Sequence, residues 1–339
     1  MDKPLIAIDA MGGAGVAVSV PACVQFLTEH TDAYVLLIGD ESEINPALHS
    51  VKPAILQRIE IEHTVEKVED DDTVLVALKN KKNASMRLAI QAVKIQRASA
   101  CVSGGNTGAL MAISCAALKT IPGINRPAIT SQLPTYHDEK GVRMLDLGAN
   151  VGSSANTLFQ FALMGSLAAT ALDKIESPRV ALLNIGQESH KGHQVIQEAG
   201  KLLQASKVLN YVGFIEPNMI FSDVVDVIVC DGFVGNIALK SMEGTARLFK
   251  HMMKSTFMSS FYGKIIACLS APIMRKLGHS MSPSRRNGAS LIGLNGIVVK
   301  SHGDANIKGF ANAIKNAYDE IQFTIPQRIA DKVTALILK

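Results

Sequence analysis

Small polar residues and glycines follow five short apolar runs of this 339-residue chain. The turns they form are Asp9-Ala10-Met11-Gly12-Gly13, Ser103-Gly104-Gly105-Asn106-Thr107-Gly108, Asp146-Leu147-Gly148-Ala149-Asn150, Asn184-Ile185-Gly186 and Asp231-Gly232-Phe233-Val234-Gly235-Asn236. Glycine lets a ligand approach the backbone closely, and Ser, Thr and Asn side chains supply uncharged hydrogen bonds. Turns of this type are suited to binding an anion such as phosphate.

The turn at 103–108 carries the strongest of these signals. It follows the apolar run Ala100-Cys101-Val102 and precedes a predicted helix, so its backbone N–H groups would converge on an anion at the positive end of that helix. We therefore expect Ser103, Gly105, Asn106, Thr107 and Gly108 to bind phosphate. The alternative is an ordinary glycine-rich turn between a strand and a helix.

Carboxylates also stand at predicted strand ends, at Asp9, Asp146 and Asp231. Such a carboxylate orients a substrate, or it caps its own turn through a hydrogen bond to the backbone. We expect substrate contacts from Asp9, Gly12, Gly13, Asn150 and Asp231.

Four further side chains are candidates for chemistry. Lys191 offers a compact charge for phosphate, with a solvated lysine before a helix as the alternative. His302 would act as an acid or hydrogen-bond donor, although a lone histidine is often structural, and Asn236 completes the catalytic set. Arg87 would meet phosphate from a helix start, or it would form a surface ion pair.

The sequence favours neither a metal nor a cofactor. The nine histidines show no HxxxH spacing with an acidic companion. Gly13-Ala14-Gly15 continues without the third small residue of GxGxxG, and neither GxxxxGK[ST] nor GxSxG occurs. We expect no metal, no nicotinamide, no ATP and no serine nucleophile.

The apolar runs are short and rich in β-branched residues, as in strands buried on both faces of a parallel sheet. They alternate with predicted helices near 84–97, 107–119, 154–172, 193–205, 236–258, 304–322 and 327–338. This alternation predicts an α/β fold with three layers, Rossmann-like, around a largely parallel sheet. Since no linker or repeat interrupts it, we expect one domain over 1–339, with all five turns in one crevice at the strand ends.

Composition narrows the class of protein. Hydrophobic residues make up 47% and charged residues 19%, which suits a large core. A net charge of +4 with 5% aromatic residues and no Trp does not favour nucleic acid. The chain passes from Met1-Asp2-Lys3-Pro4 straight into a strand, and its apolar stretch from Leu158 to Leu172 is shorter than the ~20 residues of a membrane span. We expect a cytoplasmic protein.

One segment breaks the alternation, a predicted helical hairpin at 245–282 with its bend near Gly263. Between Thr245 and Arg286 there are eight Lys or Arg and no Asp or Glu. A basic segment with an apolar tip is suited to an anionic membrane surface. The expected membrane contacts are Phe257, Phe261, Ile265, Ile266 and Leu269. A dimer interface would use the same apolar residues, and the two roles are compatible.

Six motifs in order carry a family resemblance. They are Ile6 to Gly13, Ser103 to Leu110, Lys119 to Pro127, Leu145 to Val151, Cys230 to Lys240 and Gly296 to Gly303. From residue 6 to about residue 322 the chain resembles the bacterial phosphate acyltransferases of phospholipid synthesis.

The resemblance implies that an acyl group passes from acyl carrier protein to inorganic phosphate. The acyl phosphate would then serve a membrane glycerol-phosphate acyltransferase. It also implies a fold like the isocitrate and isopropylmalate dehydrogenases and the phosphotransacetylases, a homodimer, and peripheral attachment to the inner face of the cell membrane. In the expected mechanism, phosphate held by 104–108 and Lys191 attacks the thioester directly, and backbone N–H groups stabilise the oxyanion.

The chain departs from the family pattern at two places. Ala14 stands where the family has an acidic residue, and Gly152 stands where an aspartate normally follows Gly-Ala-Asn-Val. We expect retained activity because the turn at 103–108 is intact. A phosphotransacetylase-like enzyme that uses acyl-CoA and a membrane-docked scaffold for acyl carrier protein remain the alternatives. An oxidative decarboxylase would need the metal and nicotinamide sites that the sequence lacks.

Overall fold

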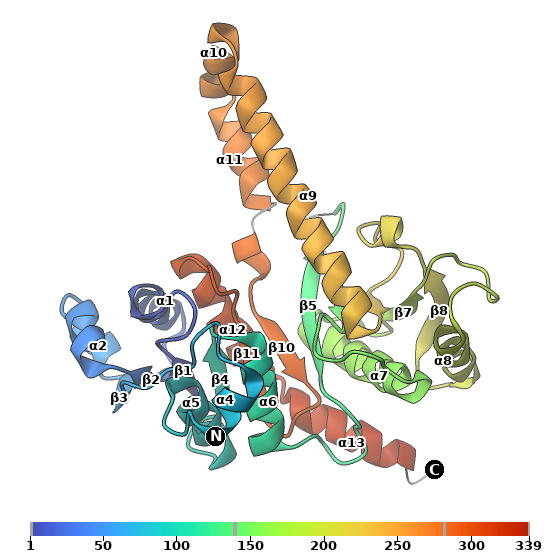
Figure 1. The fold of residues 1–339 in the computed structure, drawn as a ribbon, viewed down its shortest axis with the longest axis horizontal. Helices are drawn as coiled ribbons and strands as arrows, with labels where there is room; N and C mark the ends of the chain where they lie inside the picture. Colours follow the sequence, from blue (N-terminus) through green and yellow to red (C-terminus); the bar gives the residue numbers. More distant parts are fainter. Residues whose placement is uncertain (1–2, 138–140, 281–282, 338–339) are drawn as a thin grey trace.

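An eleven-stranded sheet runs through the chain in the computed structural model, which describes residues 3–137, 141–280 and 283–337 (Figure 1). The strand order is β3-β2-β1-β4-β11-β10-β5-β6-β9-β7-β8. The strands are β1 Leu5–Asp9, β2 Tyr34–Gly39, β3 Ile59–His63, β4 Ala100–Ser103, β5 Ala128–Pro134, β6 Gly141–Leu145, β7 Arg179–Leu183, β8 Asn210–Ile215, β9 Val227–Val229, β10 Ala289–Ile292 and β11 Ile297–Lys300.

Most of the helices cover the two faces of this sheet, and the others build an arm that projects from it (Figure 1). The helices are α1 Val16–Glu29, α2 Glu41–Leu48, α3 Pro53–Leu56, α4 Val74–Lys79, α5 Ser85–Lys94, α6 Thr107–Leu118, α7 Ala155–Leu172, α8 Gln194–Ala205, α9 Gly232–Met258, α10 Phe261–Leu269, α11 Ala271–Ser280, α12 Ile307–Gln322 and α13 Ile325–Ile337, with short 3₁₀ turns at Pro217–Met219 and Pro283–Arg286. The predicted three-layer α/β fold is confirmed.

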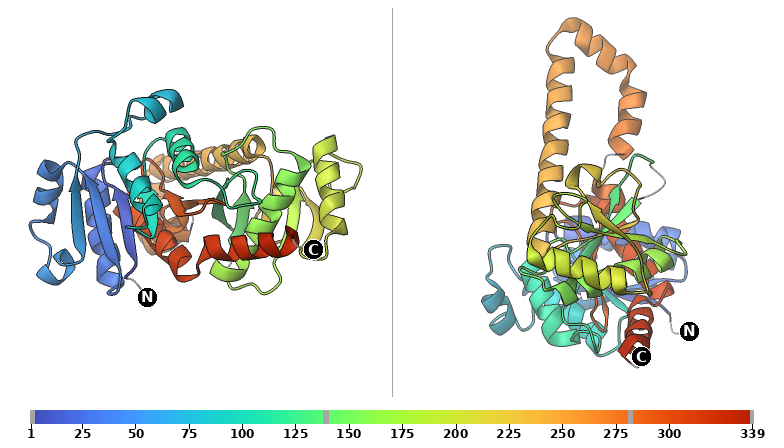
Figure 2. Two further views of the ribbon diagram at one scale, coloured as in Figure 1. Left: turned by 90° about the horizontal axis from the view of Figure 1, so that it is seen from below. Right: turned by 90° about the vertical axis from the view of Figure 1, so that its right-hand side faces the viewer.

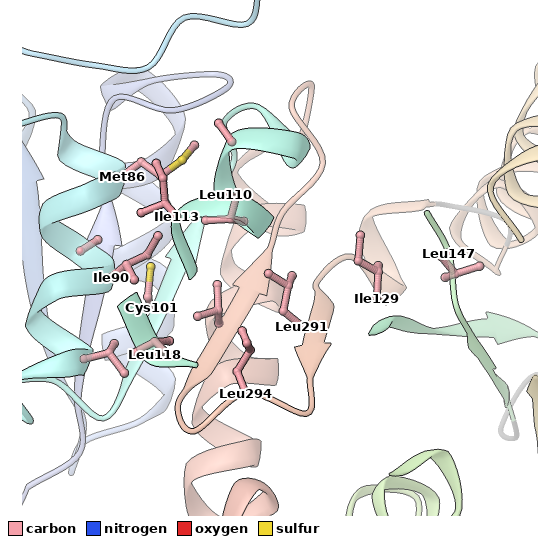
Figure 3. Close-up of a cluster of buried hydrophobic side chains, with 14 of the residues drawn as sticks. Met86, Ile90, Cys101, Leu110, Ile113, Leu118, Ile129, Leu147, Leu291 and Leu294 are labelled. Atoms are coloured by element: carbon pink, nitrogen blue, oxygen red, sulfur yellow. The ribbon is translucent and has the colours of Figure 1, made fainter. Parts of the chain in front are cut away.

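Alternate residues of the strands point into separate cores on the two faces. On one face, α5 and α6 pack Met86, Ile90, Leu110 and Ile113 against the central strands, and the same core continues under α9 (Figure 3). The other face holds two cores, one under α1 and α12 and one under α7, α8 and α13. Burial on both faces explains why the strands read as continuous apolar runs.

The sheet is less uniformly parallel than its sequence pattern indicates. β11 pairs antiparallel with β10, β10 with β5, and β5 with β6, while the other pairings are parallel. Three successive reversals leave β6, β9, β7 and β8 running opposite to β1, β2, β4 and β11. The two halves of the sheet therefore direct their strand carboxyl ends to opposite edges.

Most predicted helices lie within a few residues of their expected bounds. α4 lies within the polar segment at 69–83, outside the helices expected from the sequence. α1 begins at Val16, and Pro21 therefore lies inside the helix.

The hairpin predicted at 245–282 projects from the body as a long arm (Figures 1 and 2). Its first limb is α9, which begins at Gly232 and runs 27 residues without interruption. The chain turns at Ser259–Ser260 rather than at Gly263, because the Ser260 hydroxyl caps α10 by accepting the Gly263 N–H. α10 forms the tip and α11 returns toward the body, while residues 281–282 lie outside the described residues.

Among the described residues, one helix has the length and composition of a membrane span, α7 at Ala155–Leu172. More than half of this helix is buried, and it packs against α8, α13 and β9. It is a core helix of the sheet's second half.

Candidate functional site

The five polar turns fall into two clusters, because they follow strands of the two halves of the sheet, which run in opposite directions. Those after β1 and β4, together with the residues after β11, form a first turn cluster at 9–13, 103–108 and 300–303. Those after β6, β7 and β9 form a second turn cluster at 146–150, 184–191 and 231–236. The strands that carry the two clusters run in opposite directions, because three antiparallel pairings stand between β4 and β6.

Glycines let the backbones of the first turn cluster interlock. A Cβ added to Gly12 would stand 2.3 Å from an Asp9 carboxylate oxygen and 2.8 Å from the Gly105 nitrogen. A Cβ on Gly13, whose φ is +62°, would lie 2.6 Å from the Gly104 carbonyl oxygen and 2.9 Å from that of Gly303. The close approach that requires glycine here is between segments of the chain itself.

Asp9 organises this cluster from a buried position. Its carboxylate accepts the hydroxyls of Ser85 and Ser103 at 2.6 Å each and the Gly12 N–H at 3.1 Å. Burial raises the pKa of Asp9, and these hydrogen bonds counteract part of that rise. With 1% of its surface exposed, Asp9 holds the turns in place.

Asn106 links the turn at 103–108 to the segment at 70–72. Its side-chain oxygen caps α6 by accepting the Ala109 N–H at 3.0 Å, and its amide nitrogen donates to the carbonyls of Asp70 and Asp72. Thr107 and Gly108, at the start of α6, are exposed. Their N–H groups belong to the first turn of a helix, where no carbonyl within the helix accepts them.

Lys300, which the sequence analysis did not single out, lies within the first turn cluster. Its ammonium donates to the carbonyl of Gly104 at 3.0 Å and to that of Ser301. Burial lowers the pKa of Lys300 to about 8, opposed by the negative charges of Asp70 and Asp9. An ammonium has three N–H groups, so one remains for a ligand beyond these two hydrogen bonds. The sequence signal is a lysine ending the apolar run Ile297-Val298-Val299.

His302 is exposed next to this lysine. Its Nδ1 accepts the Asp304 N–H at 3.2 Å, and its own backbone N–H donates to the Asn287 side chain. Because Nδ1 accepts, the neutral ring carries its proton on Nε2, which makes His302 a hydrogen-bond donor at the rim of the cluster.

In the second turn cluster, Asp146 has the organising position. Its carboxylate accepts the N–H groups of Ile129, Gly148, Ala149 and Asn150. Burial is the largest influence on Asp146 and raises its pKa. The Asn150 amide is also committed within the protein, since it donates to Asp146 and to the Pro127 carbonyl.

Asp231 caps α9 through the Phe233 N–H and also accepts the Ser153 N–H at 2.7 Å. Asn236 lies one turn into α9 with an exposed side chain beside Gly148. Lys240, four residues later, lies on the same side of the helix and is close enough to Lys300 to lower the latter's pKa. One side of α9 therefore extends from the second turn cluster toward the first.

Lys191 follows β7 in the second turn cluster. Its backbone carbonyl accepts the Asn184 amide at 3.1 Å, and its side chain is exposed. Among the described residues no hydrogen bond joins Lys191 to the turn at 104–108, and one phosphate bound by both stays a prediction.

Arg87 holds α4 in place from within α5. Its guanidinium donates to the carbonyls of Ala77, Leu78 and Lys81 at 2.6–3.0 Å. Among the described residues Arg87 forms this set of carbonyl contacts in place of a surface ion pair, and its contact with phosphate stays a prediction.

Two hollows are lined by residues outside these clusters. A cavity of about 690 Å³ is lined by charged and amide side chains between α7 and α12, including Arg143, Asp173 and Asn316. A smaller one of about 250 Å³ lies between α5 and α6. Within residues 3–137, 141–280 and 283–337, no group of three or more His, Cys, Asp or Glu side chains has the arrangement of a metal site.

The model of a family described as "Fatty acid synthesis protein" matches residues 5–328. A protein from Shewanella pealeana named "Phosphate acyltransferase" is 50% identical over 339 residues, covering 100% of this chain and 99% of that protein. One of the same name from Nitrosococcus oceani is 50% identical over 326 residues, covering 96% and 95%.

The fold resembles that of a phosphotransacetylase from Streptococcus pyogenes, with a TM-score of 0.62, 18% identity and coverage of 96% of this chain and 94% of that one. A Salmonella typhimurium structure described as a 4-hydroxythreonine-4-phosphate dehydrogenase gives a TM-score of 0.54 at 12% identity, covering 94% and 99%. At these identities the likeness concerns the fold alone.

Proposed function

The chain belongs to the fatty acid synthesis protein family, with full-length relatives named phosphate acyltransferases, and on this premise we propose that it transfers a long-chain acyl group from acyl carrier protein to inorganic phosphate. The acyl acceptor follows from the relatives' name. The observation that carries the location is the convergence of Lys300, the start of α6 and the interlocked glycine turns in the first turn cluster.

Phosphate fits this cluster because its donors are complementary to an oxyanion. The remaining N–H of Lys300 supplies charge, and the exposed start of α6 at Thr107 and Gly108 supplies backbone N–H groups and the positive end of the helix dipole. Asp9 keeps the turn rigid from below without facing the ligand. His302 donates from the rim through Nε2.

The transfer needs no covalent intermediate with the enzyme. A phosphate oxygen attacks the thioester carbonyl carbon, the carbon–sulfur bond breaks, and the leaving thiolate takes up a proton to become the carrier-protein thiol. The donors that hold phosphate also orient it, and N–H groups aimed at the developing oxyanion are worth about 2.7–4 kcal/mol each. Asn236 and Lys240 on α9 form the opposing wall, where Asn236 is suited to donating to the carbonyl oxygen.

Contacts between the substrate and three residues of the second turn cluster, Lys191, Asn150 and Asp231, are a separate proposal. The amide of Asn150 and the carboxylate of Asp231 are occupied by hydrogen bonds within the protein. The side chain of Lys191 is exposed to solvent, so the variant Lys191→Met tests whether phosphate binds at the second turn cluster.

The hairpin is suited to a membrane at its tip and to a second copy of the chain along its limbs. On α10, Phe261, Ile265 and Leu269 repeat every four residues, with 75%, 43% and 77% of their surfaces exposed, and Ile266 adjoins them. Phe257 is half-buried below the tip. Large apolar side chains of α9, including Leu248, Phe249 and Met252, are also exposed, as expected for a homodimer interface. Such docking would deliver acyl phosphate to a membrane glycerol-phosphate acyltransferase.

Liposome flotation tests the membrane contact. Phe261→Ser with Leu269→Ser should release the protein from vesicles that contain anionic lipid, while the matched pair Val212→Ser with Leu202→Ser, exposed on the far half of the sheet, should not. Equal flotation of both double variants would remove the tip as the anchor.

A comparison of donors tests the acyl carrier. Palmitoyl acyl carrier protein should be used at a higher kcat/KM than palmitoyl-coenzyme A. Preference for coenzyme A would make the protein phosphotransacetylase-like, and binding of the carrier protein without turnover would make it a scaffold.

A further inference from the structure

The hollow between α5 and α6 lies beside the proposed phosphate site but is not part of it. Its floor is apolar, made by Leu88, Ile113, Ala116 and Ala117, and its rim carries Lys82, Arg87, Gln91 and Lys94. Three of these lining residues are cations and none is an acid.

The two lysines on the rim are available to a partner. Lys82 and Lys94 are exposed, and no ion pair joins either of them to another described residue. The neighbouring Lys81 differs, since it stands 3.8 Å from Asp72. Arg87 is anchored by backbone carbonyls, which leave its positive charge uncompensated. Ala116 of this floor is exposed, so the apolar lining is accessible from solvent.

The position of the hollow relates it to the first turn cluster. α5 begins at Ser85, whose hydroxyl donates to Asp9, and α6 begins at Thr107 in the phosphate-binding turn. At 1.5 Å per helical residue, the lining residues lie about 5 to 15 Å along these helices from the cluster. A partner seated here would hold a tethered group within reach of the site. The hairpin tip is on the far side of the body, so membrane contact leaves this face free (Figure 1).

We propose that the α5–α6 hollow is the docking surface for acyl carrier protein, with an acidic helix of the carrier against Lys82 and Lys94 and an apolar side chain in the hollow. This proposal rests on the proposed function for its partner. Opposite charges speed encounter and fix orientation, while the apolar contact prolongs the complex. A volume of about 250 Å³ suits one or two side chains and is too concave for a bilayer surface.

Fluorescence anisotropy of labelled holo acyl carrier protein measures docking without any turnover. Lys82→Glu with Lys94→Glu should raise the dissociation constant about tenfold and flatten its salt dependence. The control is Lys201→Glu with Lys207→Glu, which makes the same change in net charge on exposed lysines at the far end of the sheet. Ala116→Trp should fill the hollow and weaken binding with no change in charge.

Steady-state kinetics separate docking from chemistry. The double variant should raise KM for palmitoyl acyl carrier protein and leave the rate with a small S-acyl-N-acetylcysteamine donor unchanged. Binding equal to the wild type, or equal weakening in the control pair, would overturn the docking surface. Binding that depends on the hollow without acyl phosphate formation would uphold it and refute the proposed function instead.

Discussion

Replacing Lys300 by methionine tests the location of phosphate. The change removes an ammonium that is buried among the Gly104 and Ser301 carbonyls, and it keeps a side chain of similar length. A hydrogen bond to a charged group contributes about 1.5–3 kcal/mol, and every 1.4 kcal/mol corresponds to a factor of ten. We therefore expect Lys300→Met to raise KM for phosphate about ten- to hundredfold, measured from initial rates at saturating acyl donor.

The pH dependence of phosphate binding gives an independent test of the role of Lys300. Only the charged ammonium attracts phosphate, and burial places the pKa of Lys300 at about 8. Affinity for phosphate should therefore decline as the pH rises through about 8. In Lys300→Arg the side chain stays charged, so this decline should disappear even if KM is raised by the larger guanidinium.

Two controls accompany the measurement on Lys300→Met. Thermal unfolding of Lys300→Met shows whether loss of the two carbonyl contacts destabilises the fold, and Lys191→Met reports on the second turn cluster. A phosphate KM within twofold of the wild type in a folded Lys300→Met would refute the assignment. A large rise in Lys191→Met instead would move phosphate to the second turn cluster.

Three further variants test the surrounding structure. Burial raises the pKa of Glu320 to about 7, above its value of 4.5 in the unfolded chain, so the folded state binds more protons between these two pH values. The free energy of unfolding should therefore fall by up to about 3 kcal/mol as the pH rises from 4.5 to 7. Urea unfolding of Glu320→Gln should lack this fall, and a variant with the same pH profile as the wild type would contradict the prediction. Gly12→Ala would drive a Cβ against Asp9, so we expect about 1–3 kcal/mol of destabilisation in urea and a raised phosphate KM, whereas wild-type behaviour would show that the turns are not tightly interlocked. Arg87→Met should lower the melting temperature while phosphate KM stays within twofold, and the reverse pattern would restore Arg87 as a phosphate ligand.

Local sequence patterns predicted the positions of the helices and strands better than the directions in which the strands run in the sheet. Apolar runs and caps place α6, α7 and α8 within two residues of their expected bounds, because those signals are local. The reversal of the second half depends on β5 and β10, whose pairing joins Thr130 to Ser290 across 160 residues. β5 mixes polar and apolar residues and ends in Pro134, and β10 has only four residues, so no period in the sequence reveals them.

The same division applies to the site. The strand-end turns were predictable from their residue types, and so was the cap that Asn106 provides. The role of Arg87 was not, because it depends on α4 folding within a polar segment. Lys300 has a weak local signal, a charged residue closing an apolar strand, and its importance comes from Gly104, which is 196 residues away.

The most direct test of the account is the reaction itself. Purified protein is incubated with palmitoyl acyl carrier protein and inorganic phosphate, and the product is followed by phosphorus-31 NMR with hydroxylamine trapping of the acyl phosphate. We predict loss of thioester that requires phosphate, with one acyl phosphate formed for each thiol released. Loss of thioester that is independent of phosphate, or no acyl phosphate despite binding of the carrier protein, would contradict the account.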